Sequence, residues 1–325
     1  MLKFGLIGAA GYIAPRHMRA IKETGNRLDA AFDPYDGVGI MDSYFPEADY
    51  FVEFERFDRH ISKLRNQNKA LDYISICSPN YLHDSHIRFA LRSGCQAICE
   101  KPIVLNPWNV DALMDEEKNT NQEIFTILQL RHHSEILKLR DYVSSQPTDK
   151  IFEIDLTYLT SRGNWYYTSW KGDETKSGGI ATNIGVHFFD MLTWIFGDVL
   201  GNDVTLNSHD RASGFLRLEK ANVKWFLGIN YELVPAEEKK KGLRTFRSIK
   251  VDGKEIEFSN GFTDLHTTSY EAIINGKGFR ISEAKKAVEI VHSIRNAEII
   301  HDFDPDLLHS LCNHKIQNHP FKRRD

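Results

Sequence analysis

Short apolar runs alternate with longer amphipathic stretches over the first 130 residues. The runs predict strands and the stretches predict helices, because side chains repeat every two residues along a strand and about every 3.6 along a helix. This alternation is typical of a parallel sheet covered by helices, so we expect a doubly wound α/β domain. The predicted strands are Leu2–Ile7, Leu28–Asp33, Leu71–Cys77, Gln96–Cys99 and Ile124–Leu130, and the predicted helices are Ile13–Thr24, Asp58–Asn68, His83–Ser93 and Pro107–Thr120.

Beyond a helical connector at Arg131–Ser145 the strands become longer and alternate between apolar and polar positions. Such alternation is typical of an antiparallel sheet with one face packed on a core. We therefore expect a second, α+β domain with a large open, mostly antiparallel sheet. Its predicted strands are Ile151–Thr160, Gly214–Glu219, Val223–Tyr231, Phe246–Val251 and Glu255–Phe258, and its predicted helices are Thr182–Phe196, Leu265–Ile274 and Ser282–Ile299.

The composition narrows the class of protein. The chain has 325 residues, enough for about two domains at roughly 150 residues each. A formal net charge of −4 gives no general attraction to nucleic acid or to an anionic membrane surface, so neither is expected as a partner. The four cysteines lack the paired spacing of a disulfide framework or a zinc site, and we expect a cytoplasmic protein.

A glycine-rich turn joins the first predicted strand to the first predicted helix. Backbone N–H groups at such a helix start attract a pyrophosphate, and small residues let the ligand approach the backbone. We expect Gly8, Gly11, Tyr12 and Ile13 to bind a dinucleotide. The turn is one residue longer than the usual G-x-G-x-x-G, and on its own it is explained about equally well as a purely structural turn.

Asp33 strengthens this interpretation. It ends the second predicted strand, where a carboxylate typically hydrogen-bonds the adenosine ribose of a dinucleotide. Its negative charge would repel a 2′-phosphate, and no Arg or Lys occurs between Asp29 and Glu55 to offset it, so we expect NAD rather than NADP. The alternative is that Asp33 only caps a turn before Pro34.

Further motifs stand at the ends of later strands, where cofactors lie in such sheets. One is Ser78-Pro79-Asn80 with His83, and another is Glu100-Lys101-Pro102, whose Lys-Pro bond we expect to be cis. Together with the glycine turn, His17, Gly178-Gly179, and the run Asn183 to His187 followed by Asp190, they resemble the glucose-fructose oxidoreductase/inositol dehydrogenase (Gfo/Idh/MocA) family of two-domain dehydrogenases over residues 1–300.

This resemblance implies an NAD-binding Rossmann domain, which we place at 1–129, and a substrate-binding and oligomerisation domain, which we place at 130–325. It also implies that subunits pair through the open sheet, and we expect a homotetramer. The remaining residues expected to bind the cofactor are Ser78, Asn80, His83, Glu100, Lys101 and Gln129.

A narrower resemblance is carried by Gly8–His17, Ile127–His133, Thr157–Lys171 and Phe262–Tyr270. These segments resemble bacterial dehydrogenases that oxidise the 3-hydroxyl of UDP-2-acetamido-2-deoxy-glucuronic acid. The resemblance implies a 3-keto nucleotide sugar as product and a role in making lipopolysaccharide (O-antigen) sugars. Two alternatives stay open: a family dehydrogenase for a free sugar, polyol or cyclitol, and a dinucleotide-binding sensor without turnover.

Lys101 and His187 are the candidate catalytic residues. Oxidation of a secondary alcohol needs a base for the hydroxyl proton, and His187 titrates close to neutral pH. Lys101 could share that role or, as a cation, stabilise a developing alkoxide. Family members often carry Asp where this chain has Asn183, which cannot accept a proton at neutral pH but can hydrogen-bond the sugar. The alternative for His187 alone is a satisfied core histidine.

The second half of the chain should bind the substrate. Arg131, Arg162 and Lys171 offer positive charge for a carboxylate and a diphosphate, and nearby rings can stack on a sugar or a base. Which cation meets which anion stays open. The expected substrate-binding residues are Asn183, Arg131, Arg162, Asn164, Trp165, Tyr166 and Lys171. We assign no metal, because the histidine pairs His83/His86 and His132/His133 lack an adjacent acid or cysteine at a recognised ligand spacing.

Overall fold

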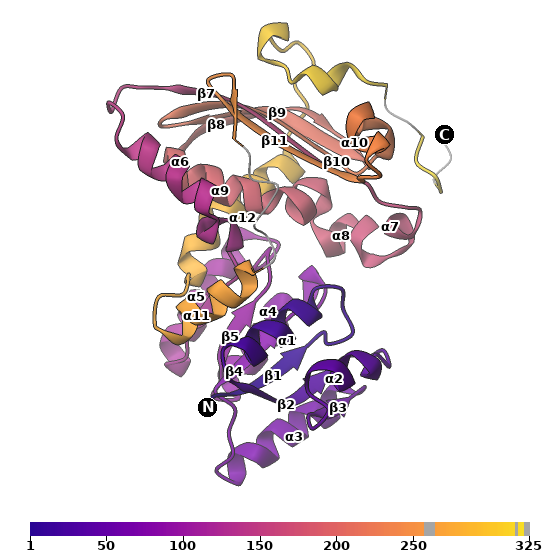
Figure 1. Ribbon diagram of the computed structural model, residues 1–325, viewed down its shortest axis with the longest axis vertical. Coiled ribbons are helices and arrows are strands. Elements are labelled where there is room, and N and C mark those ends of the chain that lie inside the picture. Colours follow the sequence, from indigo (N-terminus) through magenta and orange to yellow (C-terminus); the bar gives the residue numbers. More distant parts are fainter. Residues whose placement is uncertain (257–263, 316–317, 322–325) are drawn as a thin grey trace. The chain divides into compact units, whose positions relative to one another are not determined.

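The computed structural model describes residues 1–256, 264–315 and 318–321 (Figure 1). The predicted strand Glu255–Phe258 and the segment Phe262–Tyr270 therefore lie partly outside the described residues. The chain forms two compact units. One comprises Met1–His132 together with a later stretch that ends at Lys285, and the other comprises the remaining residues. The first unit is therefore discontinuous in sequence, because it contains both the N-terminal part of the chain and a later segment.

The first unit contains a six-stranded parallel sheet in the order β3-β2-β1-β4-β5-β6. This is the strand order of the doubly wound dinucleotide-binding fold, and the predicted fold class is confirmed. The order reverses between β1 and β4, and ligands bind outside the carboxyl ends of the strands at that switch point. The strands are β1 (Lys3–Ile7), β2 (Arg27–Phe32), β3 (Asp49–Phe51), β4 (Tyr73–Ile76), β5 (Gln96–Cys99) and β6 (Ile124–Thr126).

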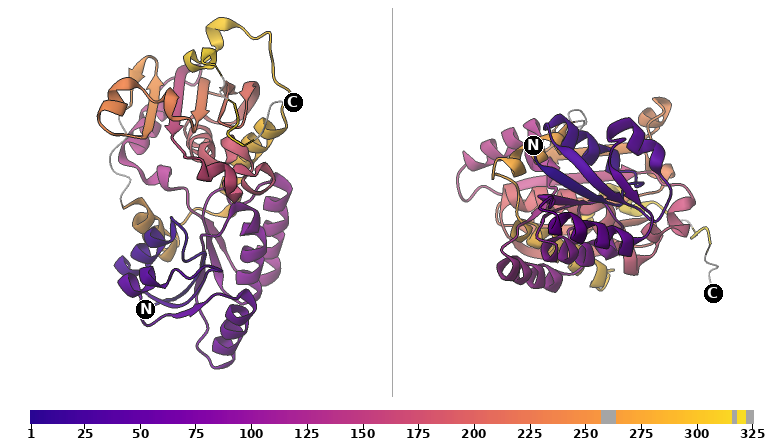
Figure 2. Two further views of the ribbon diagram at one scale, coloured as in Figure 1. Left: turned by 90° about the vertical axis from the view of Figure 1, so that its right-hand side faces the viewer. Right: turned by 90° about the horizontal axis from the view of Figure 1, so that it is seen from below.

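Helices cover both faces of this sheet (Figure 2). On one face, Met18 of α1 and Tyr270 and Ile273 of α11 share a core with Phe4 of β1. On the other, Phe57 of α3 packs with rings of neighbouring elements. The helices of this unit are α1 (Ala14–Glu23), α2 (Val38–Tyr44), α3 (Phe54–Asn66), α4 (His83–Arg92), α5 (Pro107–Thr120) and α11 (Leu265–Ile274).

The second unit contains a mixed, mostly antiparallel sheet in the order β12-β11-β7-β10-β9-β8. β7 and β10 pair in parallel, and the other neighbours are antiparallel. The β11–β12 hairpin turns at Asp252 and Gly253, both with positive φ. The strands are β7 (Phe152–Thr160), β8 (Val199–Asn207), β9 (Arg211–Leu218), β10 (Ala221–Gly228), β11 (Thr245–Val251) and β12 (Lys254–Glu255).

One face of this sheet packs on α9, where Phe189 meets Trp225 of β10 edge to face. The C-terminal segment covers part of the opposite face. There His309 Nε2 forms a hydrogen bond of 2.8 Å with Thr157 Oγ1, and the His309 ring packs against the Phe226 ring. The remaining helices are α6 (Ser134–Ser144), α7 (Trp165–Thr168), α8 (Glu174–Ser177), α9 (Val186–Phe196), α10 (Ala236–Lys240) and α12 (Lys285–Asn296). Among the described helices, none combines the length and apolar character needed to cross a bilayer.

Candidate active site

The glycine turn between β1 and α1 is built for a close backbone approach. Gly8 has φ +88°, and a Cβ there would lie 2.6 Å from the carbonyl carbon of Cys77. At Gly11 a Cβ would lie 3.1 Å from the Gly8 carbonyl oxygen. The turn therefore requires glycine at Gly8 and is tight at Gly11, which brings α1 close to the end of β4.

The backbone N–H groups of the turn divide into two sets. Those of Gly8 and Ala9 donate to the Phe32 carbonyl oxygen, and that of Gly11 donates to the Gly8 carbonyl oxygen. The next two N–H groups along, on Tyr12 and Ile13, are at the start of α1. Of the predicted set, Tyr12 and Ile13 are therefore the amides placed to meet an anion.

An open cleft of about 490 Å³ lies beside this turn. Its lining includes Ala10, Gly11, Tyr12 and Gly37, and also Arg16 from the first turn of α1. Arg16 was not predicted as a cofactor residue. Its position two residues beyond the motif, in the first turn of the helix, is the signal that could have found it, because a cation there lies near a bound phosphate.

Asp33 is buried and uses both carboxylate oxygens. Its Oδ2 accepts from the N–H of Ala10 and its Oδ1 from the N–H of Tyr35, each at 3.0 Å. The second bond is the turn cap that formed the alternative interpretation, and the first ties the acid to the glycine turn. Each oxygen keeps a further lone pair, so the geometry is compatible with a ribose hydroxyl as well.

Ser78, Asn80 and His83 are all buried at the end of β4. His83 bridges two loops, because its Nε2 lies 2.8 Å from the Ser78 carbonyl oxygen and its Nδ1 lies 2.7 Å from the Pro102 carbonyl oxygen. Burial lowers the pKa of His83, so the neutral ring donates to one of these oxygens at a time. Ser78 Oγ bonds His86 Nδ1 at 2.8 Å. His83 thus braces the loop that carries Lys101.

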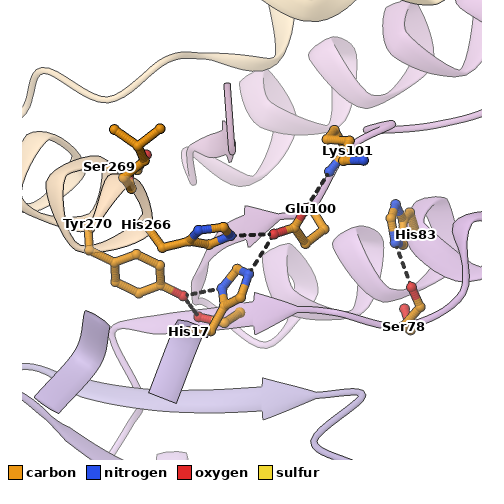
Figure 3. A network of polar contacts seen from close by, with 10 residues as sticks. His17, Ser78, His83, Glu100, Lys101, His266, Ser269 and Tyr270 are labelled. Carbon is orange, nitrogen blue, oxygen red and sulfur yellow. Dashed lines mark hydrogen bonds and ion pairs between the residues drawn. The ribbon is translucent and has the colours of Figure 1, made fainter. Parts of the chain in front are cut away.

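Glu100 follows β5 and is buried, while Lys101 beside it is partly exposed (Figure 3). Oε2 of Glu100 accepts a hydrogen bond of 3.2 Å from the backbone N–H of Lys101. The Lys101–Pro102 peptide bond is cis, as expected. Oε1 of Glu100 accepts from Nε2 of His17 and from Nε2 of His266, each at 2.9 Å. Glu100 therefore contacts the backbone of the candidate catalytic lysine directly.

Sequence reasoning missed His266 and the true role of Tyr270, both on α11. The Tyr270 hydroxyl lies 2.7 Å from His17 Nδ1 and 2.5 Å from Ser75 Oγ. His266 lies 166 residues beyond Glu100, and no local pattern signals that contact. The ligand-type atoms of His17, Glu100 and His266 fall within 4.8 Å of one another. Their 2.9 Å separations fit hydrogen bonds to one carboxylate oxygen.

Gln129 and Arg131 lie on a 3₁₀ turn, Gln129–His132, that follows β6. Arg131 is buried, and its guanidinium donates to the Glu283 carboxylate at 2.7 Å and lies 5.0 Å from the Phe279 ring centroid. Both partners belong to the late segment of the same unit. The structure therefore gives Arg131 a partner other than the substrate anion that we expected.

In the second unit, Asn183 lies on a π-helical turn, Ala181–Gly185, which precedes α9. The predicted helix Thr182–Phe196 is therefore present, and its first turn is π-helical. In the fully described stretch from Ala181 to Thr193, the side chains that are not buried are those of Asn183 and His187. The two thus share the exposed side of an otherwise buried segment, as their spacing predicted, and π-turns are frequent at functional sites.

Tyr166, an expected substrate-binding residue, is buried. Its hydroxyl accepts a hydrogen bond of 3.1 Å from Asn183 Nδ2. Burial raises the pKa of Tyr166, so the hydroxyl stays protonated. This bond orients the Asn183 amide and leaves its carbonyl oxygen as an acceptor.

Several of the expected substrate-binding residues lie at or just before the start of α7. Asn164 is exposed, Trp165 is 51% exposed, and the Arg162 guanidinium lies 5.9 Å from the Trp165 ring centroid. Lys171 lies on a 3₁₀ turn, Trp170–Gly172, with its Nζ 4.1 Å from the Trp170 ring centroid. Cations and exposed rings of this kind suit a charged, ring-containing ligand.

All four cysteines are free thiols. Burial raises the pKa of Cys77 and of Cys99 well above its usual range, so neither is a thiolate nucleophile.

The fold and the glycine turn define a dinucleotide-dependent oxidoreductase with a separate second unit. A family model described as "Oxidoreductase family, NAD-binding Rossmann fold" matches residues 2–127, and one described as "Oxidoreductase family, C-terminal alpha/beta domain" matches residues 149–227. The chain belongs to the Gfo/Idh/MocA oxidoreductase family.

Solved structures of one relative match almost the whole chain. The WlbA (WbpB) dehydrogenase from Thermus thermophilus, in complex with NAD and α-ketoglutarate, is 46% identical, with a TM-score of 0.91 over 95% of this chain and 99% of that chain. The same dehydrogenase in complex with NAD and UDP-GlcNAcA is 45% identical, with a TM-score of 0.92 over 96% of this chain and 100% of that chain.

Curated relatives are more distant. D-glucoside 3-dehydrogenase from Escherichia coli is 26% identical over 126 residues, which cover 39% of this chain and 36% of that protein. Inositol 2-dehydrogenase from Rhizobium meliloti is 26% identical over 61% of this chain and 56% of that protein. The chain thus matches between about a third and just over half of the length of these curated relatives.

The first unit fits NAD. The glycine cradle at Gly8 cannot accept a side chain, and the cleft beside it presents the first turn of α1 and Arg16. Bound there, NAD would supply a hydride acceptor, with Asp33 at the adenosine end and the β4 and β5 ends at the nicotinamide end.

Proposed function

We propose that this protein oxidises the 3-hydroxyl of UDP-2-acetamido-2-deoxy-D-glucuronic acid (UDP-GlcNAcA) to the 3-keto sugar with NAD. The observation that carries the proposal is the likeness, at 45% identity over 96% of the chain, to a dehydrogenase crystallised with NAD and UDP-GlcNAcA. In this reaction carbon 3 loses a hydride to the nicotinamide and its hydroxyl loses a proton to a base, so a C=O bond replaces the C–H and O–H bonds.

His187 is the proposed base, and Lys101 is proposed to hold the hydroxyl oxygen and stabilise the developing alkoxide. Asn183, oriented by Tyr166, is proposed to accept a hydrogen bond from a sugar hydroxyl. These assignments give each side chain a role that fits its exposure, since Lys101, Asn183 and His187 are all partly exposed.

Arg162 and Lys171 are proposed to meet the carboxylate and diphosphate of the substrate, with Asn164 and Trp165 beside them. All four are at least partly exposed in the second unit. We assign Arg131 instead to holding the turn after β6 against the late segment, because its charge is paired with Glu283 at 2.7 Å.

The setting of the reaction is also part of the proposal. We infer a cytoplasmic homotetramer that supplies sugars for lipopolysaccharide. Support comes from the free cysteines and from the substrate itself, a nucleotide-activated uronate suited to polysaccharide synthesis. The α-ketoglutarate complex of the Thermus thermophilus relative supports a keto acid as the oxidant that returns NADH to NAD.

A second candidate is the oxidation of a free sugar, polyol or cyclitol. It is favoured by the curated relatives, whose names specify a D-glucoside and inositol as substrates. The two candidates differ in the need for the UDP group, and a sensor without turnover differs from both.

The experiment that tests the proposal incubates the purified protein with UDP-GlcNAcA or with the same uronate lacking UDP, each with and without added NAD and 2-oxoglutarate. We expect a product lighter by two hydrogen atoms from the UDP sugar, and 2-hydroxyglutarate only where the UDP sugar and the keto acid are both present. Turnover of the uronate without UDP at an equal rate would favour the second candidate. No product from either would support the sensor.

A further inference from the structure

The strongest unexplained feature is the buried carboxylate of Glu100. It lies at the end of β5, with three N–H donors around it: Nε2–H of His17, Nε2–H of His266 and the backbone N–H of Lys101 (Figure 3). His17 and His266 are both buried and meet edge to face with ring centroids 5.2 Å apart. We call Glu100 with these two histidines the carboxylate cluster.

The hydrogen-bond directions make Glu100 the charged member of the cluster. Burial lowers the pKa of His17, so its ring is neutral and donates from Nε2 while Nδ1 accepts from the Tyr270 hydroxyl. Burial alone would raise the pKa of Glu100, but the hydrogen bonds from His17 and His266 outweigh it and hold the pKa well below its usual range. The hydrogen bonds thus keep the Glu100 carboxylate ionised in the interior.

Three further titratable groups around the cluster carry no charge. Burial raises the pKa of Tyr270, of Cys77 and of Cys99 far above neutral, so all three stay uncharged. Arg16, on α1, is cationic and exposed, at the cleft beside the glycine turn. Burying a carboxylate costs free energy, which makes its retention a pointer to function.

The topology places the charge at a defined part of the cofactor site. In the strand order of this sheet, the glycine turn and Asp33 serve the adenosine half of a dinucleotide, and the β4–β5 side serves the nicotinamide half. Glu100 directly follows β5. The nicotinamide ring is positive in NAD⁺ and neutral in NADH, so a nearby negative charge distinguishes the two forms.

We propose that Glu100 is an electrostatic selector that makes the site bind NAD⁺ more tightly than NADH, with His17 and His266 as positioning residues that keep the carboxylate in place. The inference goes beyond the proposed function, because it concerns the cofactor alone and holds for any alcohol substrate. In the proposed cycle, this bias favours the return of hydride from NADH to a keto acid.

The test measures the dissociation constants of NAD⁺ and of NADH for the wild-type protein and for Glu100→Gln, by calorimetry without any sugar. The variant removes one charge and leaves Lys101 in place. We expect it to weaken NAD⁺ binding about tenfold relative to NADH binding, the size of effect that a buried unit charge exerts over several ångströms. Equal weakening of both forms would mean a purely structural role and would overturn the proposal.

Two further variants separate charge from folding. Glu55→Gln removes an exposed acid on α3 of the same unit, and the NAD⁺ to NADH ratio should not move. His266→Lys places an ammonium beside Glu100 and cancels the charge without removing it, so the ratio should shift in the same direction as in Glu100→Gln. A His266→Lys ratio equal to that of the wild type would contradict the proposal even if Glu100→Gln does not fold.

Metal analysis of the same wild-type sample provides an independent check. His17, Glu100 and His266 are of the types that bind divalent metals. The proposal expects no stoichiometric metal. One bound zinc or iron per chain, lost in Glu100→Gln, would replace the fixed negative charge by a positive one and overturn the inference. Because no sugar is used, none of these outcomes depends on the identity of the substrate.

Discussion

The carboxylate of Asp33 accepts a hydrogen bond of 3.0 Å from the backbone N–H of Ala10. The acid that follows β2 therefore holds the glycine turn, beside the proposed adenosine end of the cofactor site. This relationship links cofactor choice to the shape of the turn, because a change at Asp33 alters both.

Replacing Asp33 by Asn should weaken NAD binding about tenfold. The amide keeps one acceptor oxygen but turns an NH₂ group toward one of the two backbone donors, which costs about 1 to 2 kcal/mol. Calorimetric titration with NAD measures the change. Asp36→Asn, an exposed acid three residues later, is the matched control and should bind NAD as the wild type does. Equal affinities for all three proteins would contradict the role of Asp33.

Gly8→Ala should destabilise the protein by about 2 kcal/mol or more and abolish NAD binding. Its φ of +88° disfavours any side chain, and the new Cβ would lie 2.6 Å from the Cys77 carbonyl carbon. Gly25→Ala is the control, because Gly25 has φ +73° with no neighbour within 4 Å of its Cβ position. It should cost about 1 kcal/mol from backbone strain alone. Urea unfolding measures the loss of stability in both variants. Equal losses would contradict the special role of Gly8.

Lys101→Ala and His187→Ala should each lower turnover about 100-fold or more, because each removes a group proposed to act on the sugar hydroxyl. NAD affinity should change little in either variant. Steady-state rates together with calorimetric titration separate the two quantities. Lys69→Ala, an exposed lysine of the first unit, should keep wild-type turnover. If both site variants also keep wild-type turnover, the proposed mechanism is lost.

Stability should fall as the pH drops from about 6.5 to about 4, partly through His309. Burial lowers the pKa of His309 to about 4, so between these values the unfolded chain binds a proton that the folded protein does not. The neutral ring therefore contributes stability above pH 6.5 that is lost below it, up to roughly 3 kcal/mol. Urea unfolding at several pH values should show a flatter profile for His309→Gln. The exposed His301→Gln should retain the wild-type slope; a wild-type slope in His309→Gln would exclude His309 as the source.

The first sheet was predictable because its strands and helices have the regular apolar periodicity of buried elements. Helix Pro107–Thr120 was predicted with the bounds that it has, because Asn106 and Pro107 mark its start. Strand β3 and helix α2 were missed, since three and seven residues give too short a pattern.

Part of the candidate site was predictable because its residues belong to the glycine turn or follow a strand. Gly8, Asp33 and Lys101 stand at such places. His266 could not be found, because its partner Glu100 lies 166 residues away and the contact depends on tertiary packing. The pairing of Arg131 with Glu283 likewise depends on tertiary packing and has no local pattern that signals it.

In the proposed reaction, hydride leaves carbon 3 of the UDP sugar for the nicotinamide. The test uses UDP-GlcNAcA carrying deuterium at carbon 3, incubated with NAD in one sample without and in one sample with 2-oxoglutarate. The account predicts deuterium in NADH in the absence of the keto acid and in 2-hydroxyglutarate in its presence, with none remaining in the keto sugar. Deuterium released into water, or retained on the sugar while product forms, would contradict it.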